Sequence, residues 1–335
     1  MIEYDSAFYD KVAETARSSA RHIVPIIIAS LKPKSVIDIG CGTGTWLSVF
    51  EENGIFDFLG VDANFIPRDA LEIPSAKYLT FDLSLPFKCE RKFDLVISLE
   101  VAEHLPAHCA ESFVASLIHL GSAVLFSAAI PGQGGTNHVN EQWQDYWAGL
   151  FGSHNYVPVD FLRGIVWENR EVAWWYSQNA LLYCERNYAN TSVIRKLARA
   201  ANLPLRLVHP RKFQEAVWRE RLARAAFELT RVMPPGSKFL LIDGGTAGTA
   251  FDCCGRAIPF PQREGVFAGN PPDSRAALAE MNSLKPAATH VVILESAFWW
   301  MSYYSAWFDE LMASSTPLID TDMIKIFRFN SNPQR

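Results

Sequence analysis

The chain has 335 residues and a formal net charge of −5, with 49% hydrophobic and 20% charged residues. This composition is typical of globular domains, the length allows roughly two of them, and the slightly acidic balance gives no sign of a nucleic-acid partner. The first residues do not resemble a signal peptide, and apolar runs such as residues 23–31 are much shorter than the ~20 residues of a membrane span. The six cysteines form no Cys-x-x-Cys pair, so we expect neither a zinc site nor a disulfide framework, and a cytoplasmic location.

Hydrophobic periodicity and turn residues predict an alternation of helices and strands over residues 1–185. The predicted helices cover 8–31, 45–54, 111–120 and 140–151, the last with Asn140 as its N-cap. The predicted strands cover 35–40, 56–62, 78–83, 93–101, 123–130, 156–162 and 179–185. Apolar strands separated by helices indicate an α/β fold in which helices cover both faces of a mostly parallel sheet.

The composition changes after residue 185. Residues 186–232 hold eleven Lys or Arg and three acids, so we expect a basic helical linker over 186–235, broken near Pro204 and Pro210. It is either a solvated linker or a docking face for an anionic partner or substrate. A smaller α/β domain is predicted over 236–335, with strands at 238–243, 290–296 and 323–329 and helices at 273–285, capped by Asp273, and 303–315.

A glycine-rich loop follows the first predicted strand, in the sequence VIDIGCGTGTW of residues 36–46. Glycine lets the backbone approach a ligand and adopt dihedrals that a side chain forbids. A dinucleotide-binding loop would need a further glycine where Thr45 stands. Asp38, inside the motif, is unfavourable beside a pyrophosphate but suits a ligand that carries an ammonium or sulfonium group.

Acidic residues follow the next two strands. Asp62 ends the second strand, and Asp82 comes after the third. Because the carboxyl ends of parallel strands meet at one edge of a sheet, Asp38, Asp62 and Asp82 are expected to line one crevice. Asp62 is placed to bind ribose hydroxyls, and Asp82 to accept from an adenine amino group.

The glycine loop, Asp62, Asp82 and FDLVISLEVAEHLP, in this order, resemble class I S-adenosylmethionine-dependent methyltransferases, which have a Rossmann-like seven-stranded sheet. The resemblance covers about the first 185 residues. It implies that Asp38, Gly40, Gly42 and Gly44 surround the methionine part of the cofactor. It also implies that Asp62 holds the ribose and that Asp82 and Leu83 hold the adenine, and Glu100 is expected to border the same site.

Two further segments resemble bacterial proteins of glycan biosynthesis. Residues 128–147, AAIPGQGGTNHVNEQWQDYW, resemble a methyltransferase subgroup often encoded with cell-surface polysaccharide and glycosyl-transfer enzymes. Residues 236–329 resemble a module seen in the same systems, through IPFPQREGVFAG and ESAFWW. No established activity comes with that module.

The motif Glu100-Val-Ala-Glu103-His104 follows the fourth strand. It resembles the metal-binding motif of certain magnesium-dependent O-methyltransferases. With His138 as fourth ligand, these residues would hold Mg²⁺ or another divalent cation, which would lower the pKa of a bound substrate hydroxyl. Alternatively, the motif serves only to pack the loop and start a helix.

His138 has a second possible role. A neutral imidazole can act as a general base toward a hydroxyl near neutral pH, and Glu141 could orient it or begin the following helix. His104 is the other catalytic candidate. The aromatic run Trp174-Trp175-Tyr176 is either core or the wall of a sugar pocket.

The residues themselves indicate only a base suited to a hydroxyl acceptor, and the resemblance to the glycan-associated subgroup implies O-methylation of a sugar hydroxyl in a glycan, nucleotide sugar or glycosylated metabolite. The alternatives are a methyltransferase for a non-sugar small molecule, with N or O as acceptor, and a catalytically silent cofactor-binding subunit of a glycan assembly complex. The sequence carries no signal for an oligomeric state.

Overall fold

The structure, a computed structural model, describes residues 6–63, 68–199, 204–248, 250–251 and 256–330. The chain divides into two compact units, Met1–Phe213 and Gln214–Arg335. The segment 186–235, expected to be a linker, is therefore shared between them. Helices α7 (Arg186–Ala189) and α8 (Ser192–Arg199) lie in the first unit, whereas most of α9 (Pro210–Val232) lies in the second. Cys253 and Cys254 are outside the described residues.

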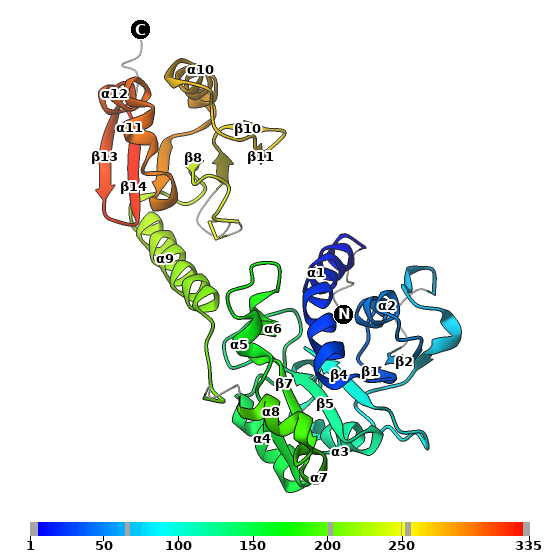
Figure 1. The fold of residues 1–335 in the computed structure, drawn as a ribbon. Helices are drawn as coiled ribbons and strands as arrows, with labels where there is room; N and C mark the ends of the chain where they lie inside the picture. The colour runs from blue at the N-terminus through cyan, green and yellow to red at the C-terminus, as the bar shows by residue number, and fades with distance from the viewer. Residues whose placement is uncertain (1–5, 64–67, 200–203, 249, 252–255, 331–335) are drawn as a thin grey trace. The chain divides into compact units, whose positions relative to one another are not determined.

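A seven-stranded sheet forms the centre of the first unit (Figure 1). Its order is β3-β2-β1-β4-β5-β7-β6, and only β7 runs antiparallel to its neighbours. The strands are β1 (Ser35–Ile39), β2 (Asp57–Asp62), β3 (Tyr78–Thr80), β4 (Leu95–Leu99), β5 (Ala123–Ser127), β6 (Tyr156–Val159) and β7 (Leu181–Glu185). The predicted Rossmann-like seven-stranded sheet is confirmed.

Both faces of this sheet are covered by helices, as the strand composition requires. On β1, Val36 packs in one core cluster, with α1 (Ser6–Leu31), α2 (Thr45–Glu52) and α6 (Trp174–Asn179), while Ile37 and Ile39 pack in the other. The second cluster contains α3 (Ala110–Leu120) and α4 (Gln144–Ser153). Successive side chains of a strand point to opposite faces, so a strand that is buried on both sides is apolar at nearly every position.

Two local expectations for this unit are wrong. Asn140 does not cap a helix, because α4 begins four residues later, after Trp143. Asn140 is instead buried, and its backbone N–H donates to the backbone oxygen of Glu103 at 3.0 Å. The short helices α5 (Arg163–Val166) and α6 precede β7 where no helix was expected, since one or two helical turns are too short to show a period in the sequence.

The second unit is the predicted smaller α/β domain, and its five-stranded sheet has the order β13-β14-β12-β8-β9. The strands are β8 (Lys238–Ile242), β9 (Arg256–Pro259), β12 (His290–Leu294), β13 (Ser315–Asp320) and β14 (Ile324–Phe329), with a separate hairpin of β10 (Gln262–Arg263) and β11 (Val266–Phe267). Its helices besides α9 are α10 (Ser274–Leu284), α11 (Trp300–Tyr303) and α12 (Ser305–Ser314).

Asp273 caps α10 as expected, since its Oδ1 accepts from the N–H of Ala276 at 2.8 Å. The hairpin partner strand β13 and strand β9 were not predicted. None of the described helices of either unit is long and apolar enough to cross a membrane.

Residues 204–212 are firmly attached to the first unit. Arg163 is completely buried, forms an ion pair with Asp160, and donates to the backbone oxygens of Pro204 and Leu205 at 2.8 and 2.9 Å. Arg206 binds both carboxylate oxygens of Asp145 at 2.8 and 2.7 Å. The cations of this stretch thus stabilise the fold of the first unit.

These contacts predict where the first unit can be cut. A fragment of residues 1–213 should unfold cooperatively, whereas a fragment of residues 1–185 should be less stable by at least about 3 kcal/mol, because the buried Arg163 loses two carbonyl acceptors and the apolar side chains of α8 are removed. Urea unfolding followed by circular dichroism measures both fragments. Equal stability of the two fragments would place the end of the first unit at residue 185.

Candidate functional site

The glycine loop between β1 and α2 needs glycine for two physical reasons. Gly40 and Gly44 have φ values of 87° and 88°, in the left-handed region that side chains rarely adopt. A Cβ at Gly40 would lie 2.3 Å from a methyl of Val101, and one at Gly44 would lie 2.7 Å from Ile73. Gly42, at φ 55°, has open space beside it. Gly40 and Gly44 thus pack closely against neighbouring side chains, and of the three only Gly42 leaves open space beside the backbone at the carboxyl end of β1.

Asp62 fixes this loop to the end of β2. Its Oδ2 accepts from the N–H of Gly42 at 2.6 Å, and its Oδ1 accepts from the N–H of Ala63 at 2.6 Å. Burial raises the pKa of Asp62, although these two hydrogen bonds oppose the shift. Each carboxylate oxygen has a second lone pair, so Asp62 can still accept from a ligand hydroxyl.

Asp38 is almost completely buried near the end of β1. Burial, and then the negative charge of Asp62, raise the pKa of Asp38 well above its ordinary value. Two neighbouring acids in a buried crevice repel each other. A cationic ligand between them would remove this penalty.

Asp82 and Leu83 follow β3 at the same edge of the sheet. Asp82 is exposed, and its Oδ1 accepts from the N–H and the hydroxyl of Ser84 at 2.9 and 2.7 Å. These hydrogen bonds lower the pKa of Asp82. Leu83 is buried. An exposed, ionised carboxylate is thus available at this edge of the sheet.

Glu100, directly after β4, is held in a cluster of amides. Its φ of 55° is unusual for a residue other than glycine. Gln133 Nε2 donates to its Oε2 at 2.9 Å, and Asn179 Nδ2 donates to its Oε1 at 3.1 Å. Burial raises the pKa of Glu100, while the hydrogen bonds from Asn179, Ser127 and Gln133 oppose the shift. Sequence reasoning missed these amides, because nothing in their spacing relates residue 133 or 179 to residue 100.

Three of the four residues expected to bind a metal lie together. Glu103, His104 and His138 each offer one ligand atom, and these atoms lie within 4.8 Å of one another. The rings of His104 and His138 meet edge to face at 4.9 Å between centroids. Glu100 is not in this group, and the amides of Gln133 and Asn179 bind its carboxylate instead.

Glu103 and His104 are both affected by burial. Glu103 is fully buried, and neither of its carboxylate oxygens has a hydrogen-bond partner among the described residues. Burial and the charge of Glu100 raise the pKa of Glu103 well above its ordinary value. Burial, then the neighbouring His138, lower the pKa of His104.

Glu141 orients His138. Its Oε1 lies 3.0 Å from Nδ1 of His138, and its two oxygens accept from the N–H groups of Gly132 and Gly134 at 2.7 and 2.8 Å. A Cβ at Gly135 would lie 2.2 Å from Nε2 of His138. The glycines of this loop therefore leave room for the imidazole and supply donors to its carboxylate partner.

Aromatic side chains line the same region. Tyr176 is buried, and its ring meets that of Trp46, on α2, at 5.2 Å between centroids. Burial, together with the charges of Glu100 and Asp38, raises the pKa of Tyr176. Trp174 is also buried and Trp175 half-buried. Trp175 is thus the member of this run with surface left for a ligand.

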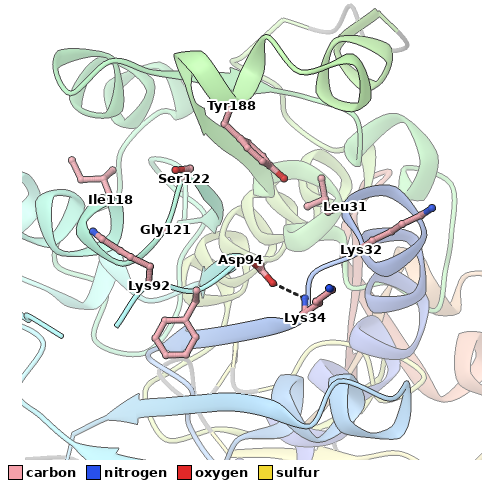
Figure 2. Close-up of a pocket in the computed structure, with 10 residues that line it drawn as sticks. Leu31, Lys32, Lys34, Lys92, Asp94, Ile118, Gly121, Ser122 and Tyr188 are labelled. Carbon is pink, nitrogen blue, oxygen red and sulfur yellow. Dashed lines mark hydrogen bonds between the residues drawn. The ribbon is translucent and has the colours of Figure 1, made fainter. Parts of the chain in front are cut away.

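A pocket of about 530 Å³ lies at the other edge of the sheet, as Figure 2 shows. Its residues precede β1, β4 and β5, where Asp94 Oδ2 accepts from the N–H groups of Lys34 and Ser35. Ligands of open α/β sheets bind at the carboxyl ends of the strands. We therefore place the functional site at the glycine loop and not in this pocket.

One comparison with known proteins, the family model, names the kind of domain. Residues 12–169 match the family model described as a methyltransferase domain, whereas no curated protein matches the chain. Among solved structures, DesVI of Streptomyces venezuelae is similar, at 23% identity and a TM-score of 0.33, over 40% of this chain and 61% of that one. Magnesium protoporphyrin IX methyltransferase of Synechocystis with bound SAM is similar at 16% identity and a TM-score of 0.41, over 55% and 85%.

An O-methyltransferase family protein of Burkholderia thailandensis is similar at 16% identity and a TM-score of 0.39, over 55% of this chain and 60% of that one. This chain thus spans about three fifths of DesVI and of the Burkholderia protein. These likenesses are too weak to identify a substrate.

The Glu141 contacts predict a pH dependence. Burial raises the pKa of Glu141, but the hydrogen bonds from His138, Gly134 and Gly132 outweigh it, so the folded pKa lies below the ordinary value of 4.5. A depressed carboxyl pKa stabilises the fold above the unfolded value and loses that contribution as the pH falls through the folded value. Glu141→Gln should therefore cost about 1 kcal/mol at pH 7, and the difference from wild type should shrink below pH 4. Urea unfolding at several pH values measures this, and a pH-independent difference would contradict it.

Proposed function

We propose that this chain, whose residues 12–169 form a methyltransferase domain, transfers the methyl group of S-adenosylmethionine to a hydroxyl of a sugar-bearing acceptor. The observation that carries the cofactor assignment is the buried Asp38 and the half-buried Asp62 beside the open backbone of Gly42. S-adenosylmethionine carries an ammonium and a sulfonium group, so it brings positive charge into a crevice that is otherwise electrostatically unfavourable.

Each cofactor-binding residue would have a distinct task. The backbone at Gly40, Gly42 and Gly44 would accommodate the methionine part, with Asp38 near its ammonium group. Asp62 would accept from the ribose hydroxyls with the lone pairs that Gly42 and Ala63 leave free. Asp82 and Leu83 would provide a hydrogen-bond acceptor and an apolar surface for the adenine.

The acceptor hydroxyl would be activated by His138. Glu141 accepts from Nδ1, which leaves Nε2 free to take a proton. The acceptor O–H bond breaks as its proton passes to Nε2. The oxygen would take the methyl group of S-adenosylmethionine as the carbon–sulfur bond breaks, and S-adenosylhomocysteine would be the leaving group. The protein contributes mainly the in-line alignment of oxygen, carbon and sulfur.

A divalent cation is a competing use of the same imidazole. The carboxylate of Glu103 and the nearby His104 and His138 fit a divalent cation that takes mixed oxygen and nitrogen ligands, such as Fe²⁺ or Zn²⁺, better than Mg²⁺, which prefers oxygen ligands. Such an ion would lower the pKa of a hydroxyl bound to it. Since Nδ1 of His138 already contacts Glu141, Nε2 can serve either as base or as ligand, and not as both at once.

The sugar part of the proposal is supported by the sequence of residues 128–147 and by the half-buried Trp175, whose ring can stack on a sugar face. Glycans, nucleotide sugars and glycosylated metabolites share the acceptor chemistry, a secondary hydroxyl beside an apolar ring face.

Cofactor binding can be tested at Asp62. Replacing it with alanine should weaken the binding of S-adenosylmethionine at least about tenfold, the effect of losing one charge-assisted hydrogen bond. Isothermal titration calorimetry measures the affinity. Asp57→Ala is the matched control, since Asp57 is exposed at the opposite end of the same strand. Unchanged affinity in Asp62→Ala would remove this residue from the site.

Turnover can be tested with methyl-labelled S-adenosylmethionine and a panel of nucleotide sugars, oligosaccharides, phenols and amines. We expect label in a sugar, and a loss of at least about a hundredfold in rate for His138→Ala. Label in a phenol or amine alone would overturn the sugar assignment, and no label in any acceptor would favour a silent cofactor-binding subunit. Repeating the assay in EDTA, then with Mg²⁺ or Mn²⁺, separates the two uses of His138: full activity in EDTA leaves it as the base.

A further inference from the structure

Lys212, in the first turn of α9, is a buried cation beside the proposed acceptor site. Its side chain is 4% exposed, and its Nζ donates to the backbone oxygen of Gln133 at 2.6 Å. The ammonium also lies 5.6 Å from the ring centre of Trp174. Burying an ammonium group is costly unless it is hydrogen-bonded. A neutral side chain at this position would avoid that cost, so we expect the charge of Lys212 to have a role here.

Gln133 connects this lysine to the centre of the site. Its side-chain Nε2 donates to Glu100, and its Oε1 accepts from Asn179 at 3.0 Å and from the N–H of Ile130 at 3.2 Å. A single residue thus contacts the end of β4, the end of α6 and the start of the loop 130–141, and Lys212 binds its remaining polar group, the backbone oxygen.

The two neighbours of Gln133 hold the catalytic pair. The N–H groups of Gly132 and Gly134 donate to Glu141, which in turn contacts Nδ1 of His138. Any shift of Gln133 therefore moves both backbone donors of Glu141. Three glycines in four residues make this loop intrinsically flexible, so its geometry depends on contacts from outside the loop.

Lys212 is itself presented by a fixed segment. The backbone N–H of His209 donates to Oε1 of Gln178 at 2.8 Å, and the guanidinium of Arg211 donates to the backbone oxygens of Asn169 and Val172 at 3.2 and 3.1 Å. The ammonium thus reaches Gln133 from an anchored segment.

We propose that Lys212 is a positioning residue that holds the loop 130–141, and through it His138 and Glu141, in the geometry for methyl transfer. A charged donor suits this task because such hydrogen bonds are about twice as strong as neutral ones. The link to methyl transfer rests on the proposed function; the effect on the loop does not.

The test compares Lys212→Met, which keeps the length of the side chain but removes the donor, with Lys212→Arg, which keeps charge and donors. Hydrogen–deuterium exchange on the full chain should be about tenfold faster in peptides of residues 130–141 for Lys212→Met, with unchanged exchange in β1 and β2, and Lys212→Arg should restore at least half of the protection. Lys196→Met, at an exposed lysine of α8, is the matched control. Should Lys212→Met fail to fold, Lys212→Gln is measured in the same way.

Two further readouts separate positioning from general damage. The affinity for S-adenosylhomocysteine should stay within about twofold in Lys212→Met, and on any acceptor that is methylated, kcat should fall about tenfold while KM for S-adenosylmethionine is unchanged. The proposal would be overturned if residues 130–141 exchanged as slowly in Lys212→Met as in the wild type. It would also be overturned if they exchanged as fast in Lys212→Arg as in Lys212→Met. Failure of the acceptor panel would leave the exchange result intact, so it refutes only the proposed function.

Discussion

The burial of carboxylates at the carboxyl edge of the first sheet is the constraint on which the rest of the site depends. Asp38 and Glu103 are buried there and Asp62 and Glu100 are half-buried, and burial raises the pKa of all four because a carboxylate charge away from water is costly. Backbone N–H groups compensate Asp62 and side-chain amides compensate Glu100. The described residues supply no such partner for the Glu103 carboxylate. Burial and the charge of Glu100 raise the pKa of Glu103 well above its ordinary value, so a cation beside it would favour its ionised form.

The first unit extends along the chain beyond the last strand of its sheet. Its seven strands end at residue 185, yet Arg163, Gln178 and Gln133 all find partners between residues 204 and 212. Within the basic stretch expected to be a solvated linker or a docking face, residues 204–212 therefore pack into the first unit. Charge composition cannot distinguish a solvated linker from a packed segment, because the sequence does not show whether a lysine binds a buried carbonyl oxygen or lies in water.

The sequence predicted what depends on short-range pattern. The strands, the glycine loop and the placement of Asp38, Asp62 and Asp82 after successive strands follow from periodicity and from the geometry of parallel sheets. It could not predict the amide cluster around Glu100, since Gln133 and Asn179 meet it only through the tertiary fold. Asn140 failed as a helix cap for the same reason: its partners lie on the loop after β4.

The left-handed backbone of Glu100 has a consequence for engineering. A non-glycine residue at φ 55° costs of order 1 kcal/mol, so selection for thermal stability alone would favour glycine there. Replacing Glu100 with glycine would relieve the backbone strain and remove the hydrogen-bond acceptor that the amides of Gln133 and Asn179 share. Stabilising libraries screened without an activity assay would thus tend to erode the site first at this position, and a strained glutamate in relatives of this chain would be a sign that the site is still in use.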